Sequence, residues 1–153
     1  MLWKSLTPDI RLAVADALWR DDQGTEQQVE ALVLLSRRLH YRPKSLQALP
    51  VERRAKMLAQ APDVTEAIAM RSLMAYHFSA RRPLMAAFLD ALGIAHEDGL
   101  ITNENVPVPD KGRLADAVRA IRAAFPAADV DLYLNTLVAI DPDTWGGIEG
   151  VAP

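Results

Sequence analysis

The chain has 153 residues, of which half are hydrophobic and about a quarter are charged, and it contains no cysteine. This length predicts one domain with a substantial core, and the missing cysteine excludes disulfides, thiolate catalysis and cysteine-ligated zinc. The first residues lack the apolar run of a signal peptide, and no window approaches about 18 uncharged apolar residues. We therefore expect a cytoplasmic protein that does not enter a membrane.

A net charge of −3 conceals a strong asymmetry along the chain. Residues 36–82 hold ten Lys or Arg and three acids, a balance of +7, whereas residues 83–153 hold four Lys or Arg and eleven acids, a balance of −7. Opposite charges on two parts of one chain favour docking between them, either within the molecule or between two copies. The charge pattern therefore predicts a protein partner or a homodimer.

Apolar residues recur at helical spacing through the first third of the chain. A helix is predicted over residues 8–22, because Thr7 can cap its start and Gly24 permits a left-handed exit. A second helix is predicted over residues 25–42, because Thr25 opens a capping box and a proline follows Arg42. We expect a short connector after this proline.

The middle of the chain continues in the same pattern. After the connector 44–49, the next helix is predicted over residues 50–60. Asp63 can then cap a helix over residues 64–78, which is apolar around most of its circumference. Such a helix is expected near the centre of the fold.

Three further helices are predicted over residues 83–93, 110–125 and 129–140. Gly93 ends the first and Asp110 caps the second, and between them lies an irregular loop, residues 94–109. Residues 141–153 are expected to form an irregular tail. The sequence thus predicts an all-α fold over residues 1–153, a single-domain irregular bundle of about six to seven helices.

The loop 94–109 carries His96, Glu97 and Asp98, which could bind a ligand. Consecutive side chains point in different directions and rarely hold one metal ion together, so these three residues do not define a metal site. The alternative is a solvated turn followed by an extended strap over the bundle. A ligand or partner site and a structural turn both remain open here.

A second acidic segment, DPDTWG at 141–146, partly matches a calcium-binding EF-hand loop. Asp141 and Asp143 stand at its first and third positions, but Trp145 occupies the fifth position and Ala152 the twelfth, where oxygen ligands are needed. We therefore expect no metal, and we expect the indole of Trp145 to fold over the core.

Arg71 lies on a packed sector of the 64–78 helix, where an unpaired guanidinium would be costly. It either pairs with an acid from the C-terminal half or binds an anionic ligand, with His77 two turns further along the helix. A lone histidine on such a face is more often a core residue held by a hydrogen bond. Both interpretations of the two residues remain open.

The basic region 37–56 is the largest charge signal. The helix dipole explains arginines at helix C-termini, but it does not explain Arg53, Arg54 and Lys56, which fall in early turns of their helix. These residues predict a surface for an acidic protein. Nucleic acid is the less favoured partner, because the chain is acidic overall and no helix-turn-helix pattern is present.

No catalytic triad order, nucleophile elbow, Walker sequence or dinucleotide fingerprint occurs in the chain. We therefore predict a non-enzymatic interaction or regulatory module that needs no cofactor and works by self-association or by docking a protein. The alternative is a small-ligand-binding protein or hydrolytic enzyme that uses an Arg71 and His77 pocket beneath the loop 94–109.

Overall fold

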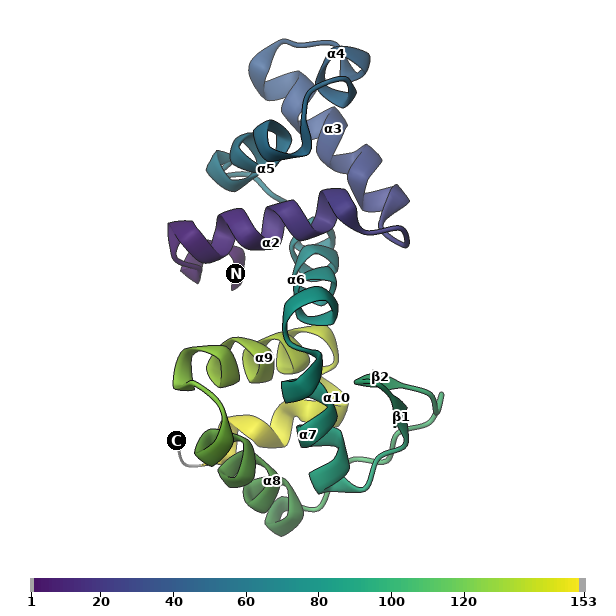
Figure 1. The fold of residues 1–153 in the computed structure, drawn as a ribbon, viewed down its shortest axis with the longest axis vertical. Helices are drawn as coiled ribbons and strands as arrows, with labels where there is room; N and C mark the ends of the chain where they lie inside the picture. The colour runs from purple at the N-terminus through teal and green to yellow at the C-terminus, as the bar shows by residue number, and fades with distance from the viewer. Residues whose placement is uncertain (1, 152–153) are drawn as a thin grey trace. The chain divides into compact units, whose positions relative to one another are not determined.

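A computed structural model describes residues 2–151, and the described chain is almost entirely helical (Figure 1). It forms ten α-helices, one 3-10 helix and one two-stranded hairpin, which confirms the predicted all-α class. Seven of these helices have ten residues or more, in agreement with the expected six to seven. The chain divides into two compact units, one ending at Tyr76 and one beginning at His77. A single domain remains a prediction.

The N-terminal unit contains five complete helices and the part of a sixth that ends at Tyr76. They are α1 (Leu2–Ser5), α2 (Pro8–Arg20), α3 (Thr25–Leu39), α4 (Pro43–Gln47), α5 (Val51–Gln60) and α6 (Glu66–Ala80). Helices α2 and α5 pack against each other. Their apolar faces explain this pairing, because Val14 and Leu18 of α2 and Ala55 and Leu58 of α5 are all buried.

Three of the predicted helix boundaries are confirmed. The Thr7 side chain accepts a hydrogen bond from the backbone N–H of Ile10 at 3.4 Å, and Asp110 accepts one from Arg113 at 3.3 Å. Gly93 ends α7 (Arg82–Leu92) with a φ of +69°, in the left-handed region that favours glycine. Polar caps and a C-terminal glycine were therefore reliable signals at these three positions.

The prediction for the turn between α2 and α3 was wrong. Gly24 has a φ of −97°, and Thr25 lies inside α3 instead of capping it. The chain already leaves α2 in an extended conformation at Asp21, so no left-handed residue is required. The side chain of Gln28 donates to the backbone carbonyls of Leu18 and Asp21, both at 2.8 Å, and thereby stabilises the end of α2.

Two further boundaries differ from the prediction. The expected connector 44–49 is mostly helical, because α4 covers Pro43–Gln47 and buries Leu46 completely. Thr65, and not Asp63, lies before α6, where its hydroxyl accepts a hydrogen bond from the backbone N–H of Ile68 at 3.3 Å. Burial of Leu46 explains why the segment 43–47 is helical. The hydroxyl of Thr65 lies closer to the first free N–H groups of α6 than Asp63 does, which explains where α6 begins.

The C-terminal unit is built around α7, α8 (Lys111–Ala124) and α9 (Ala127–Ile140), followed by α10 (Pro142–Trp145) and the 3-10 helix η1 (Gly146–Gly150). Its core joins apolar side chains from all five elements. At its centre the Phe88 ring lies 5.7 Å from Tyr133, edge to face, and 5.9 Å from Trp145. The indole of Trp145 is buried, so the expectation that it folds over the core is confirmed.

Two segments expected to be irregular contain regular structure. The loop 94–109 includes an antiparallel hairpin of β1 (His96–Glu97) and β2 (Leu100–Ile101). Asp98 and Gly99 form its turn with φ values of +50° and +90°, as a two-residue type I′ turn requires. The predicted irregular tail 141–153 contains α10 and η1, and residues 152 and 153 lie outside the described part of the chain.

No helix in residues 2–151 is both long and apolar enough to cross a lipid bilayer.

Candidate functional site

Arg71 forms an ion pair within the N-terminal unit. Its Nε lies 2.7 Å from Oδ2 of Asp21, and the Asp21 side chain is only 14% exposed. The partner therefore comes from the turn after α2, and the expectation of an acid from the C-terminal half was wrong. At 100° per residue, Arg71 and His77 point about 120° apart around α6, so the helix does not place them on one face.

His77 is completely buried and makes a hydrogen bond to Thr136 of α9. The Thr136 hydroxyl donates to the carbonyl of Leu132 at 2.7 Å, so it accepts from Nε2–H of His77, 3.0 Å away. Burial, and to a smaller extent the positive charge of Arg81, lowers the pKa of His77 to about 4. His77 is thus a neutral core histidine at pH 7, and burial likewise raises the pKa of its ring neighbour Tyr133.

His96 fastens the hairpin to α7. Its Nδ1 accepts the backbone N–H of Gly99 at 3.0 Å, so Nε2 carries the proton and donates to Oδ1 of Asp90 at 2.6 Å. Both ring nitrogens are therefore occupied by structural hydrogen bonds. The aspartate–histidine pair resembles a catalytic dyad in composition, but this geometry leaves no ring nitrogen for a substrate.

The turn of the hairpin is held by a second contact with α7. Arg82 donates through Nη1 to the backbone carbonyl and the carboxylate of Asp98, at 3.1 and 3.2 Å. A Cβ on Gly99 would lie 2.9 Å from Cβ of Met85, so the turn approaches the helix closely. Asp98 is thus part of a structural turn, and no group of three or more His, Asp or Glu in residues 2–151 is arranged to hold a metal ion.

The EF-hand match has a structural explanation as well. Asp141 accepts a hydrogen bond from the backbone N–H of Thr144 at 3.2 Å and so caps α10. Its hydrogen bonds to Thr144 lower the pKa of Asp141. The acidic residue is therefore a helix cap.

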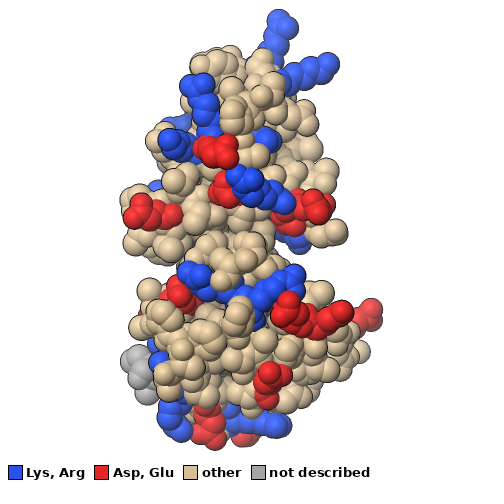
Figure 2. Space-filling model, viewed as in Figure 1, with Lys and Arg blue, Asp and Glu red and all other residues tan. Residues whose placement is uncertain are grey.

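The end of α3, the following turn and the start of α4 form a surface that we call the basic corner, residues 37–45. Every residue in it is exposed, and four of the nine are cations: Arg37, Arg38, Arg42 and Lys44. Arg38 lies 3.9 Å from Asp63, while the other three cations make no ion pair with any described residue. In Figure 2 blue side chains, and no red ones, are visible on the end of the N-terminal unit that bears α4.

Two apolar side chains lie among these cations. Leu39 is 36% exposed and Tyr41 is 53% exposed. The backbone around them is fixed, because His40 adopts a left-handed conformation with a φ of +59° and the Ser36 hydroxyl donates to the carbonyl of Tyr41. The basic corner is thus a shaped surface that combines charge with exposed apolar area.

The three cations of α5 do not form one group. Arg53 and Lys56 are exposed and make no ion pair with a described residue, as their position opposite the buried face predicts. The guanidinium of Arg54 instead stacks over the ring of Trp19 at 5.0 Å. Arg54 therefore has a structural contact inside the N-terminal unit, whereas Arg53 and Lys56 remain available at the surface.

The C-terminal unit carries a surface of opposite character, residues 97–110, which we call the acidic strip. It contains four acids, Glu97, Asp98, Glu104 and Asp110, and no Lys or Arg. Leu100 and Val108, which are 49% and 68% exposed, lie between these acids. The strip therefore combines negative charge with exposed apolar side chains.

The sequence interpretation missed one feature of α8. Lys111, Ala115, Arg119 and Arg122 lie along one face of this helix and line a groove of about 770 Å³. The signal was present in their spacing of four, four and three residues, which is helical, but the same helix also carries the stronger apolar pattern of Leu114 and Ile121.

Comparison with protein-family models, with curated proteins and with solved structures finds no match for this chain. Three candidate surfaces are therefore defined by the residues and geometry of this chain alone. They are the basic corner, the acidic strip and the groove on α8.

Proposed function

We propose that the protein is a non-enzymatic interaction module, and that its basic corner docks onto the acidic strip of a second copy. The observation that carries this proposal is a set of three exposed cations without an ion pair among the described residues, Arg37, Arg42 and Lys44, beside the exposed side chains of Leu39 and Tyr41. Arginine and tyrosine are enriched in the centres of protein interfaces, where they combine polar contacts with apolar area. The corner has this composition.

Internal stability does not account for all of these cations. Arg37 and Arg38 lie in the last turn of α3, where the helix dipole favours positive charge. Arg42 is the N-cap residue of the five-residue helix α4 and Lys44 lies within this helix, and neither makes an ion pair with a described residue. An acidic partner would supply the counter-charge that both lack.

The acidic strip is complementary to the corner in two respects. Glu97 and Glu104 make no ion pair with a described residue, so their carboxylates are free to meet guanidinium groups. The exposed Leu100 and Val108 supply apolar area opposite that of the corner. When each copy contributes one corner and one strip, the same contact forms twice and closes a dimer.

The histidine geometry supports a role other than hydrolysis. The two nitrogens of His96 are occupied within the hairpin, and burial keeps His77 neutral against Thr136. Arg71 is engaged by Asp21. The residues considered for a catalytic or anion-binding pocket therefore act in three separate structural contacts.

Sedimentation velocity of the pure protein tests the proposal. We expect reversible self-association with a dissociation constant on the order of 10 µM at about 25 mM salt, which weakens at about 300 mM salt because exposed charges are screened. Lys44→Glu should weaken association by about tenfold or more. Lys4→Glu is the matched control, because Lys4 is also exposed in the N-terminal unit and the charge change is identical.

The apolar part of the contact has its own variant. Tyr41→Ala should weaken association at both salt concentrations, because apolar contacts are not screened. A protein that stays monomeric at 25 mM salt contradicts the proposal, and so does equal weakening by Lys44→Glu and Lys4→Glu. If the protein stays monomeric and binds a single-stranded oligonucleotide, and Lys44→Glu abolishes this binding, the partner of the basic corner is nucleic acid and not a second copy.

A further inference from the structure

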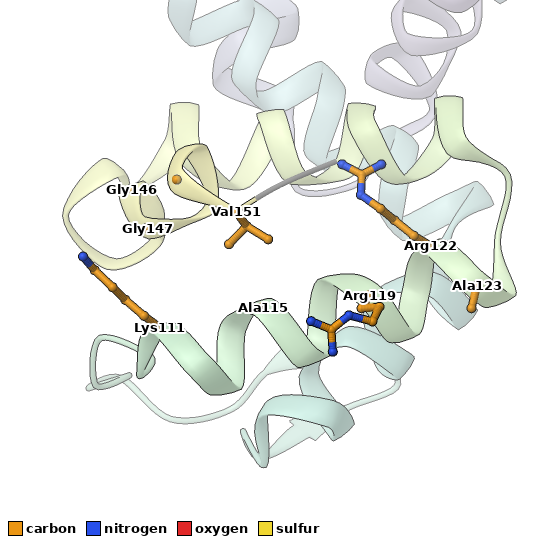
Figure 3. Close-up of a pocket in the computed structure, with 9 residues that line it drawn as sticks. Lys111, Ala115, Arg119, Arg122, Ala123, Gly146, Gly147 and Val151 are labelled. Carbon is orange, nitrogen blue, oxygen red and sulfur yellow. The ribbon is translucent and has the colours of Figure 1, made fainter.

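A cationic groove runs along α8 in the C-terminal unit (Figure 3). One wall is the helix face that carries Lys111, Arg119 and Arg122, with Ala115 between them. The buried side chains of α8 lie on the adjacent face, centred about 100° around the helix from these cations, and the core contains none of the three cations. Helix α8 therefore packs into the core through other side chains, and the three cations remain at the surface of the groove.

Glycines and Val151 form the other wall. A Cβ on Gly147 would lie 3.1 Å from Cδ2 of Leu114, so glycine lets η1 approach α8 closely at this point. A Cβ on Gly146 or Gly150 would meet no atom within 4 Å. The absence of side chains at these two positions leaves the groove open, and its volume of about 770 Å³ lies in the range of small-molecule sites.

The charged side chains that line the groove are all positive. Lys111 has no ion pair with a described residue, and Arg119 contacts Asp116 in a pair whose side chains are about three-quarters exposed. Such an exposed pair contributes little and exchanges readily for another anion. The groove consequently presents positive charge at both of its ends.

Arg122 provides the most specific feature. Its Nη1 lies 2.9 Å from Asp131, which fixes one edge of the guanidinium. Its Nε is enclosed and makes no hydrogen bond within residues 2–151, while the side chain as a whole is 26% exposed. An anion in the groove would therefore meet the exposed part of the guanidinium, where a charge-assisted hydrogen bond to a carboxylate or phosphate is strong.

We propose that this groove binds a small aliphatic dianion, a dicarboxylate or a bisphosphate, with one anionic group on Arg122 and Arg119 and the other on Lys111. Eight residues separate Lys111 from Arg119, which corresponds to about 12 Å along a helix, so two anionic groups on one flexible chain can reach both ends. The lining contains no aromatic side chain on which a nucleobase could stack. The site is independent of the proposed docking of the basic corner.

Isothermal titration calorimetry of the full chain tests the site with three probes: citrate, fructose 1,6-bisphosphate and adenosine monophosphate. We expect saturable binding of citrate or the bisphosphate with a dissociation constant on the order of 1 mM or below, and whichever of the two binds more tightly identifies the anionic group. Arg122→Met should weaken this binding at least about tenfold. Ala115→Glu, which adds a carboxylate to the lining, should do the same without removing any existing contact.

Arg113→Met is the matched control, because Arg113 lies on α8 and is exposed but does not line the groove. It should change the affinity less than twofold. Equal weakening by Arg122→Met and Arg113→Met would show that net charge alone attracts the probes and would overturn the site. Absence of saturable binding, or adenosine monophosphate bound as tightly as the other probes, would overturn it as well.

Discussion

His77 makes the stability of the protein depend on pH in a defined direction. In the unfolded chain its pKa is close to 6.5, whereas burial lowers the pKa of His77 to about 4 in the folded protein. Between these two values the unfolded state binds a proton that the folded state does not bind, so acid favours unfolding. The stabilisation is complete above pH 6.5, decreases as the pH falls and reaches its limit near pH 4.

The magnitude follows from the two pKa values. Linkage predicts that wild type loses about 2 kcal/mol of unfolding free energy between pH 7 and pH 5 through this residue, and about 3 kcal/mol by pH 4. His77→Gln removes the titration but keeps an N–H donor for Thr136, which lies 3.0 Å from the histidine. Between pH 7 and pH 5 the unfolding free energy of the variant should therefore fall by about 2 kcal/mol less than that of wild type, and by about 3 kcal/mol less by pH 4.

Urea unfolding followed by circular dichroism at pH 7, 6, 5 and 4 measures the effect. All other ionisable side chains are the same in the two proteins, so the difference between wild type and His77→Gln isolates His77. His40→Gln is the matched control, because it removes an exposed histidine instead of the buried one. Parallel pH profiles of wild type and His77→Gln would refute the assignment of a buried neutral histidine.

Further predictions concern the contacts that fix the hairpin and α6. Gly99→Ala should lower the free energy of unfolding by about 1–3 kcal/mol, because the φ of +90° disfavours a side chain and the new Cβ would lie 2.9 Å from Cβ of Met85. Gly146→Ala is the control. A Cβ there has no atom within 4 Å, so the free energy of unfolding in urea should change by less than about 0.5 kcal/mol. Equal effects of the two substitutions would contradict the close packing of the turn. Arg71→Met should lower the free energy of unfolding by about 1–3 kcal/mol, because it leaves the partly buried Asp21 without its ion-pair partner. Arg119→Met removes a pair whose side chains are about three-quarters exposed, so it should lower this free energy by less than about 0.5 kcal/mol. A thermal or urea unfolding series in which Arg71→Met is no more damaging than Arg119→Met would contradict a stabilising ion pair.

The helical class and most helices followed from the sequence, because apolar spacing and caps such as Thr7 and Asp110 are local signals. The hairpin did not, although Asp98–Gly99 is a strong sequence signal for a type I′ turn. Its strands are only two residues long, too short for the alternation that predicts a strand. The hairpin depends on its contacts with Arg82 and Asp90 of α7, which no local pattern reveals.

The candidate site residues were harder to interpret, because their meaning depends on partners that are distant in sequence. Asp21 lies 50 residues from Arg71, and Thr136 lies 59 residues from His77. Composition identified that Arg71 needs an anion, but it could not identify which one. The groove on α8 was missed because its second wall comes from glycines at 146 to 150, which carry no side-chain pattern.

Charge exchange between two variants tests the proposed docking most directly. The corner variant carries Arg42→Glu and Lys44→Glu in the basic corner, and the strip variant carries Glu97→Lys and Glu104→Lys in the acidic strip. Each variant alone opposes like charges in both contacts of a dimer, whereas a dimer of one with the other restores opposite charges in both contacts. Sedimentation velocity at about 25 mM salt should show the two variants as monomers when separate and as a 1:1 dimer when mixed. A mixture that stays monomeric while the wild type associates would contradict the pairing of the basic corner with the acidic strip.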